Sequence, residues 1–100
     1  MFDFLFGNNK LKTALRNGAA IIDLRSPRRF DDGHIPDAIN IPIDRISINT
    51  SRIKGMNVPI ILCGDTDDIT RARQLLLNDG VKEVLSGGPW SRLLKIIQSL

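Results

Sequence analysis

Short apolar runs alternate with helix-like segments along this sequence, and that alternation limits the possible folds more than any other feature. Three runs have the length of strands, namely AAIID (19–23), VPIILC (58–63) and VKEVLS (81–86). The first two are almost continuously apolar, which is typical of strands buried on both faces of a parallel sheet. Because helical patterns separate the runs, the sequence predicts an α/β domain with helices covering both faces of a central parallel sheet.

The segments between these runs carry helix start and stop signals. Ser26 is a candidate cap with Pro27 at the first helical position, and Pro89 opens the last helical pattern. A brief strand is expected over 38–41, between two prolines. The predicted helices cover residues 8–18, 26–33, part of 43–53, a segment from near 67–69 to near 78–80, and the C-terminal stretch after Pro89.

Composition fits one globular domain over residues 1–100. The formal charge of +3 comes from 14 basic and 11 acidic residues, and the basic ones are scattered along the chain. With no tyrosine to stack on bases, this pattern argues against a nucleic-acid partner. No stretch approaches the roughly 18 apolar residues of a membrane span, and the start MFDFLFGNNK lacks the features of a secretory leader. We therefore expect a cytoplasmic monomer without a membrane partner.

The chain has a single cysteine, Cys63, at the end of the run VPIILC. One cysteine cannot form an internal disulfide, and with one histidine there is no metal-ligand set, so no metal or cofactor is expected. The thiol is either a buried filler or a reagent. In open parallel sheets ligands bind beyond the carboxyl ends of the strands, and N–H groups at a helix start stabilise anions. That position suits a thiolate or a persulfide.

Several motifs in order resemble the rhodanese-like sulfurtransferase domains. The stretch IIDLRSPRRFDDGHIPDAINIP (21–42) is similar to the family's N-terminal signature of Asp-x-Arg, an aromatic residue, Gly-His-Ile-Pro and Asn-Ile-Pro. Cys63 falls at the family's nucleophile position, Arg71 and Ala72 keep their places in the next helix, and VKEVLSGGPW (81–90) is similar to the late strand and Gly-Gly turn. The resemblance implies three layers around about five parallel strands.

The resemblance also implies the chemistry and the site. Cys63 would take a sulfane sulfur from a small sulfur-containing donor or a protein persulfide, hold it as a persulfide, and pass it to a thiophilic acceptor such as a thiol or a carrier protein. The amides of the following loop would cradle that sulfur. The implied substrate-binding residues are Gly64, Asp65, Thr66, Asp67, Asp68, Ile69 and Arg71.

The loop after Cys63 departs from the family because it is acidic. Asp65, Asp67 and Asp68 stand where many members carry a cation, and like charges near a thiol disfavour its thiolate. They would also repel thiosulfate, so we expect poor activity with thiosulfate and a preference for a neutral or protein-bound persulfide. In the alternative interpretation, an aspartate caps the helix and its neighbours face water.

Four residues outside the loop have structural interpretations. His34, between Gly33 and Pro36, is expected to be a turn residue, and Asp23 and Arg25 to form an ion pair. Trp90 is assigned to the core. Arg71 is either a substrate contact or a solvated arginine.

The sequence is consistent with three functions. The leading one is a rhodanese-type sulfurtransferase, and the second is a weakly active binding or regulatory module whose acidic loop docks a partner protein. A redox sensor forming a mixed disulfide through Cys63 is the third. The related dual-specificity phosphatases are disfavoured because they need a longer loop with a phosphate-binding arginine, whereas here the sixth residue after the cysteine is Ile69.

Overall fold

The computed structural model describes residues 8–100. Residues 1–7, on which the expectation about the N-terminal start rests, lie outside the described residues. In chain order the elements are α1 (Asn8–Arg16), β1 (Ala20–Asp23), α2 (Pro27–Asp32), β2 (Ile39–Asn40), the 3-10 turn η2 (Ile43–Arg45), α3 (Thr50–Lys54), β3 (Ile60–Cys63), α4 (Thr66–Asn78), β4 (Val84–Gly88) and α5 (Trp90–Gln98).

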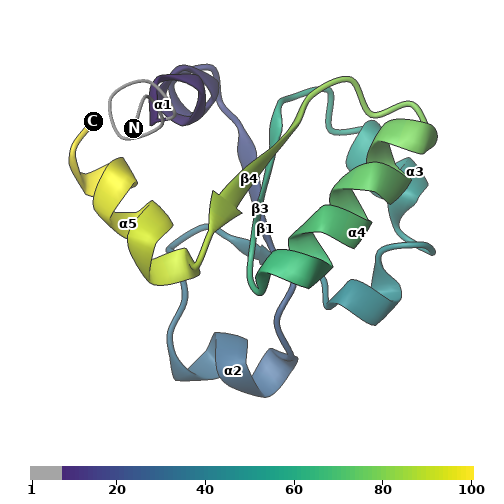
Figure 1. Cartoon of the computed structure of the whole chain (residues 1–100), viewed down its shortest axis with the longest axis horizontal. Coiled ribbons are helices and arrows are strands. Elements are labelled where there is room, and N and C mark those ends of the chain that lie inside the picture. The colour runs from purple at the N-terminus through teal and green to yellow at the C-terminus, as the bar shows by residue number, and fades with distance from the viewer. Residues whose placement is uncertain (1–7) are drawn as a thin grey trace.

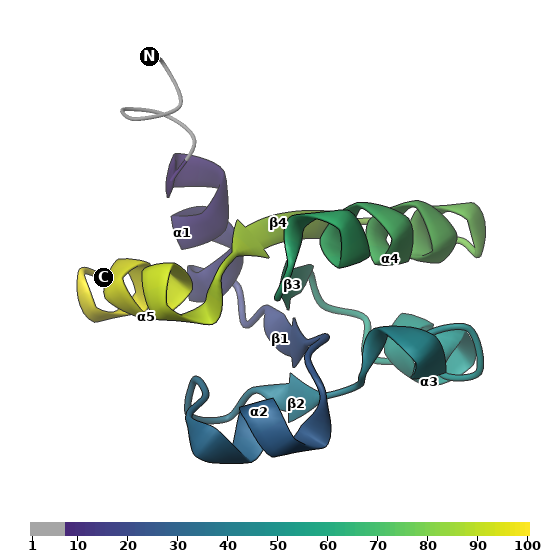
Figure 2. The same cartoon turned by 60° about the horizontal axis from the view of Figure 1, so that its bottom comes forward.

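The strands form one parallel sheet in the order β2-β1-β3-β4. Helices cover both faces: α1 and α5 lie on one side, and α3 and α4 on the other, while α2 lies near the end where β1 leads out of the sheet (Figures 1 and 2). The expected three-layer α/β architecture is confirmed. The described residues contain four strands rather than about five, because only four segments pair.

The sheet separates two groups of buried side chains. The α4-side core contains Ile22, Leu62 and Ile69 among its fully buried members. The α5-side core consists of Leu11, Ala14, Ile35, Ile61, Cys63, Leu93 and Ile96. Because successive side chains of a strand point to opposite faces, β3 contributes alternately to the two cores. This alternation accounts for the nearly continuous apolar run in the sequence.

The strand and helix boundaries differ from the predictions by a residue or two at several ends, and the differences at α4 and β4 affect the site. α4 begins at Thr66, before the predicted start at 67–69, and β4 spans 84–88 rather than 81–86. The residues before β4 instead belong to the connection from α4, with Val81 packed into the α4-side core. None of the helices within 8–100 combines the length and apolar character that a membrane crossing requires.

Candidate active site

Three strand ends meet at Cys63. In the parallel register Asp23 of β1 lies opposite Cys63, and Gly88 of β4 pairs with it from the other side. The sheet continues one step further, since the Leu24 N–H donates to the Cys63 carbonyl at 2.9 Å and the Gly64 N–H donates to the Gly88 carbonyl at 3.1 Å. The thiol therefore lies at the carboxyl edge of the two central strands, where α/β sheets commonly place their ligands.

The Cys63 side chain is fully enclosed by the protein. Its exposed fraction is 0%, and it packs with Ile61, Leu93 and Ile96 in the α5-side core. Burial, followed by the charge of Asp23, raises the pKa of the Cys63 thiol to about 12, while Arg25 acts in the opposite direction. In this conformation Cys63 is a neutral thiol at physiological pH.

Only two residues separate β3 from α4. Gly64 has φ 143°, a conformation that side chains with a Cβ rarely adopt, and Asp65 is the N-terminal cap residue. The Gly64 N–H is already bonded to Gly88, and the Ile69 N–H donates to the Asp65 carbonyl inside the helix at 2.9 Å. The predicted loop is therefore shorter than expected, because Thr66 to Ile69 form the first turn of α4.

The aspartates after Cys63 also differ from the sequence-based expectation. Asp65 lies 3.5 Å from an Arg29 guanidinium nitrogen, and Asp68 lies 3.1 Å from one of Arg71, so both have cationic partners. The carboxylate that raises the pKa of Cys63 is Asp23 of the neighbouring strand. The inference that these acidic residues stand without a compensating cation is therefore wrong for Asp65 and Asp68. Separation along the chain was a poor guide to separation in space.

A cavity of about 330 Å³ opens beside Gly64 and Asp65, the residues that follow Cys63. Arg71, the cation expected from the sequence, does not line this cavity, and Trp90, which packs against the α5-side core as predicted, does. The structure brings residues to the cavity from three strand-to-helix connections and from the helices that follow them, α2, α4 and α5. Its lining consists of Arg25, Arg29, Gly64, Asp65, Thr66, Pro89, Trp90 and Ser91. These residues follow the carboxyl ends of β1, β3 and β4 or belong to α2. That shared position was the sequence signal that could have identified them as cavity residues.

The two arginines of this cavity have different bonding. Arg25 is buried, and its guanidinium donates to both carboxylate oxygens of Asp23 at 2.7 to 3.2 Å and to the Gly33 carbonyl at 2.8 Å. It also lies 5.3 Å from the centre of the half-buried Trp90 ring, within cation–π range. The predicted Asp23–Arg25 ion pair is confirmed. Arg29, by contrast, projects from α2 and contacts only Asp65 among the charged groups described.

Other predicted site residues lie elsewhere. Ile69 is buried in the α4-side core, and Arg71 lines a different cavity together with Asp44. His34 is held as a turn residue, with Nδ1 2.6 Å from the Phe30 carbonyl and its ring stacked on the Phe30 ring. Of the predicted set, the structure brings Gly64, Asp65 and Thr66 to the cavity beside Cys63.

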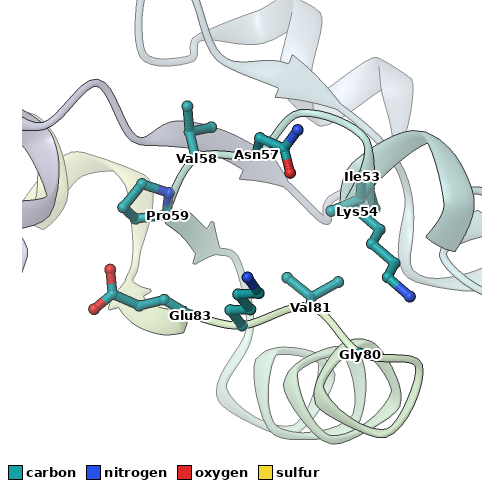
Figure 3. Close-up of a pocket in the computed structure, with 9 residues that line it drawn as sticks. Ile53, Lys54, Asn57, Val58, Pro59, Gly80, Val81 and Glu83 are labelled. Atoms are coloured by element: carbon teal, nitrogen blue, oxygen red, sulfur yellow. The ribbon is translucent and has the colours of Figure 1, made fainter.

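A second cavity, of about 310 Å³, lies at the amino-terminal ends of β3 and β4 (Figure 3). Ile53, Val58 and Val81 contribute apolar surface there, with Lys54 and Lys82 nearby. It is at the opposite end of the strands from the thiol, and no cysteine or histidine lines it. Within residues 8–100, no three histidine, cysteine or acidic side chains come together in a way that could hold a metal ion.

The fold is a parallel α/β sheet with a cysteine at the carboxyl end of β3, one of its two central strands. The rhodanese-like domain family model matches residues 8–88, and this chain belongs to that family. It is 33% identical over 72 residues to the uncharacterized protein YqhL of Bacillus subtilis, an alignment that covers 70% of this chain and 57% of that relative. The chain thus spans little more than half the length of that curated relative.

Solved structures show the same fold. A Rhodanese_3-like domain from Anabaena is 26% identical, with a TM-score of 0.63 over 69% of this chain and 80% of that one. A rhodanese from E. coli is 21% identical, with a TM-score of 0.66 over 75% and 91%. The human single-domain sulfurtransferase TSTD1 is 19% identical, with a TM-score of 0.63 over 87% and 91%. The latter two likenesses concern the fold alone.

Proposed function

We propose that this domain is a rhodanese-type sulfurtransferase in which Cys63 carries a sulfane sulfur as a persulfide. The observation that supports it is the position of the thiol, at the carboxyl end of β3 and directly before Gly64, which lines a cavity containing Arg25 and Arg29. A lone thiol that must stay reduced suits the cytoplasm, where the domain would act as a monomer in sulfur relay.

The reaction has two balanced steps. The Cys63 thiolate attacks the terminal sulfur of a donor persulfide, R–S–SH, forming Cys63–S–SH while the donor S–S bond breaks and R–S⁻ leaves. An acceptor thiolate then attacks the outer sulfur of Cys63–S–SH, becomes a persulfide itself and releases the Cys63 thiolate. Neither step needs a metal, an oxidant or a reductant.

The enclosed thiol makes exposure a part of this proposal. With an exposed fraction of 0% and a pKa of about 12, Cys63 does not react until the residues covering it move and the thiolate is formed. The two residues that connect β3 to α4, Gly64 and Asp65, border the cavity. Slow turnover of thiosulfate, with a preference for persulfide donors, is the expected result.

The same burial favours a second candidate, a rhodanese-like binding module that has lost transfer. Here Cys63 is a permanent part of the α5-side core, and the exposed charges of Arg29 and Asp65 contact a partner protein. This alternative predicts that no sulfur reaches Cys63 under conditions that keep the domain folded.

Intact mass separates the two candidates. The chain is incubated with thiosulfate, with cysteine persulfide and with inorganic polysulfide, and then weighed with and without added thiol. Addition of one sulfur, removed by thiol and absent from Cys63→Ser, supports the transferase. If none of the three donors adds sulfur to the folded wild type, while the unfolded chain is modified, the transferase is refuted and the binding module is favoured.

A further inference from the structure

Arg29 is the exchangeable cation of the cavity beside Cys63. Arg25 already has Asp23, the Gly33 carbonyl and the Trp90 ring as partners and is almost fully buried. Arg29 has one contact, to Asp65 at 3.5 Å, and the two side chains are 56% and 62% exposed. Exposed ion pairs of this kind contribute at most about 1 kcal/mol, so a bound anion can replace Asp65 at little cost.

The group now facing Arg29 indicates what that anion is. Asp65 presents a carboxylate, and a guanidinium forms two parallel hydrogen bonds with a carboxylate, whose planar geometry matches its own. The cavity of about 330 Å³ is at the small end of ligand sites and suits a molecule the size of an amino acid or short peptide. Trp90 gives it an aromatic wall on the side of β4.

We propose that the cavity selects low-molecular-weight persulfides that carry a carboxylate, and that this carboxylate replaces Asp65 on Arg29. The inference rests on the proposed sulfur transfer and names its donor class. It revises the sequence-based preference for neutral donors, which assumed that the aspartates had no cationic partner.

Replacing Asp65 also links donor binding to access to the thiol. Asp65 occupies the N-cap position of α4 and directly follows Gly64, and both residues line the cavity, whereas the preceding residue, Cys63, does not line it and packs into the α5-side core. A donor that takes Arg29 from Asp65 removes a side-chain contact between α2 and this short connection. The connection is then freer to move and expose Cys63. A donor without a carboxylate leaves the contact in place.

The test compares matched donors. Cysteine persulfide carries a carboxylate and cysteamine persulfide lacks it, and sulfur loading of Cys63 is followed by intact mass. For the wild type we expect kcat/KM to be roughly 2- to 5-fold higher with cysteine persulfide, as an ion pair of up to about 1 kcal/mol with the exposed Arg29 would give. Arg29→Gln should abolish this preference by raising KM for cysteine persulfide alone. Arg28→Gln, an exposed neighbour that does not line the cavity, is the matched control and should behave as the wild type.

A binding measurement keeps the inference testable if no sulfur is transferred. Trp90 is the only tryptophan of the chain, so its fluorescence reports on the cavity. S-methylcysteine should quench or shift it at a concentration roughly twofold to fivefold below that needed for S-methylcysteamine, and Arg29→Gln should remove the difference. Asp65→Asn should strengthen S-methylcysteine binding only when Arg29 is present.

The outcomes separate the two proposals. Equal loading by both donors, unchanged in Arg29→Gln, overturns the donor class and leaves sulfur transfer intact. If thiosulfate and polysulfide also fail where neither of these donors loads Cys63, sulfur transfer is refuted, and the fluorescence titration then decides whether Arg29 still selects carboxylates. Equal binding of the two thioethers overturns the inference in either case.

Discussion

Alkylation of Cys63 should be slow at neutral pH and should accelerate with pH over an unusually wide range. Burial, followed by the charge of Asp23, raises the pKa of this thiol from 9.0 to about 12. Because iodoacetamide reacts with the thiolate, the change in pKa alone lowers the reactive fraction at pH 8 about a thousandfold. The exposed fraction of 0% slows the reaction further, since the reagent must also reach the sulfur.

The single cysteine makes the assay simple. Intact mass after timed exposure to iodoacetamide between pH 7 and pH 10.5 gives one rate at each pH, with N-acetylcysteine as the free-thiol reference. The Cys63 rate should rise about tenfold for each pH increment of one over the whole range, whereas the reference should level off near pH 9. Circular dichroism at each pH shows that the domain remains folded, and chain unfolded in guanidinium should react like the reference.

Two results would contradict this reasoning. A plateau near pH 9 in the folded domain would show an ordinary pKa, and a rate within tenfold of the reference at pH 8 would show an accessible thiolate. Asp67→Asn provides a matched test of the charge argument, because Asp67 is exposed in the first turn of α4. The structure predicts an unchanged rate for this variant, whereas reasoning from sequence distance predicts a faster one.

Three further predictions concern stability. The folded-state pKa of Cys63 lies above its unfolded value, so the thiol's contribution to stability is complete below pH 9 and is lost as pH rises towards 12. In urea unfolding, the free energy of unfolding of Cys63→Val should therefore fall by about 1.4 kcal/mol less than that of the wild type between pH 7 and pH 10. Arg25→Met leaves Asp23 buried without its partner and should cost about 3–5 kcal/mol by the same measurement, a smaller loss meaning that water reaches the carboxylate. A Cβ on Gly87 would lie 2.8 Å from Leu93 Cδ2, so Gly87→Ala should lower the free energy of unfolding by about 1–3 kcal/mol. An unchanged midpoint of urea unfolding would show that Leu93 can move aside.

The fold was largely predictable because its signals are local. Strand length, apolar continuity and the prolines at 27 and 89 placed the main elements in the right order. The start of α4 was predicted late because the first helical turn, Thr66 to Asp68, is polar and looks like a loop when only apolar periodicity is considered. The fifth strand was implied by resemblance alone, and no pairing within 8–100 provides it.

The site was less predictable because it depends on contacts between distant segments. Asp23 acts on Cys63 through the parallel register of two strands forty residues apart in sequence, while the nearer Asp65 faces Arg29. The direction of the Cys63 side chain depends on which helices cover that face of β3. Nothing in the run VPIILC indicates that α1 and α5 would enclose it.

The sheet divides the buried side chains so that Cys63 shares its side with the first and last helices described. α1 and α5 are nine residues long each, and they close the α5-side core against the same face of the sheet (Figure 2). Proteins open in cooperative units whose free energies differ, and short peripheral helices commonly open before the central strands do. Partial unfolding of this layer alone would expose the thiol while the α3–α4 side stayed folded. In the absence of donor, trapping of the Cys63 thiol then measures how often the two end helices leave the sheet, and amide hydrogen exchange in α1 and α5 should follow the same free energy.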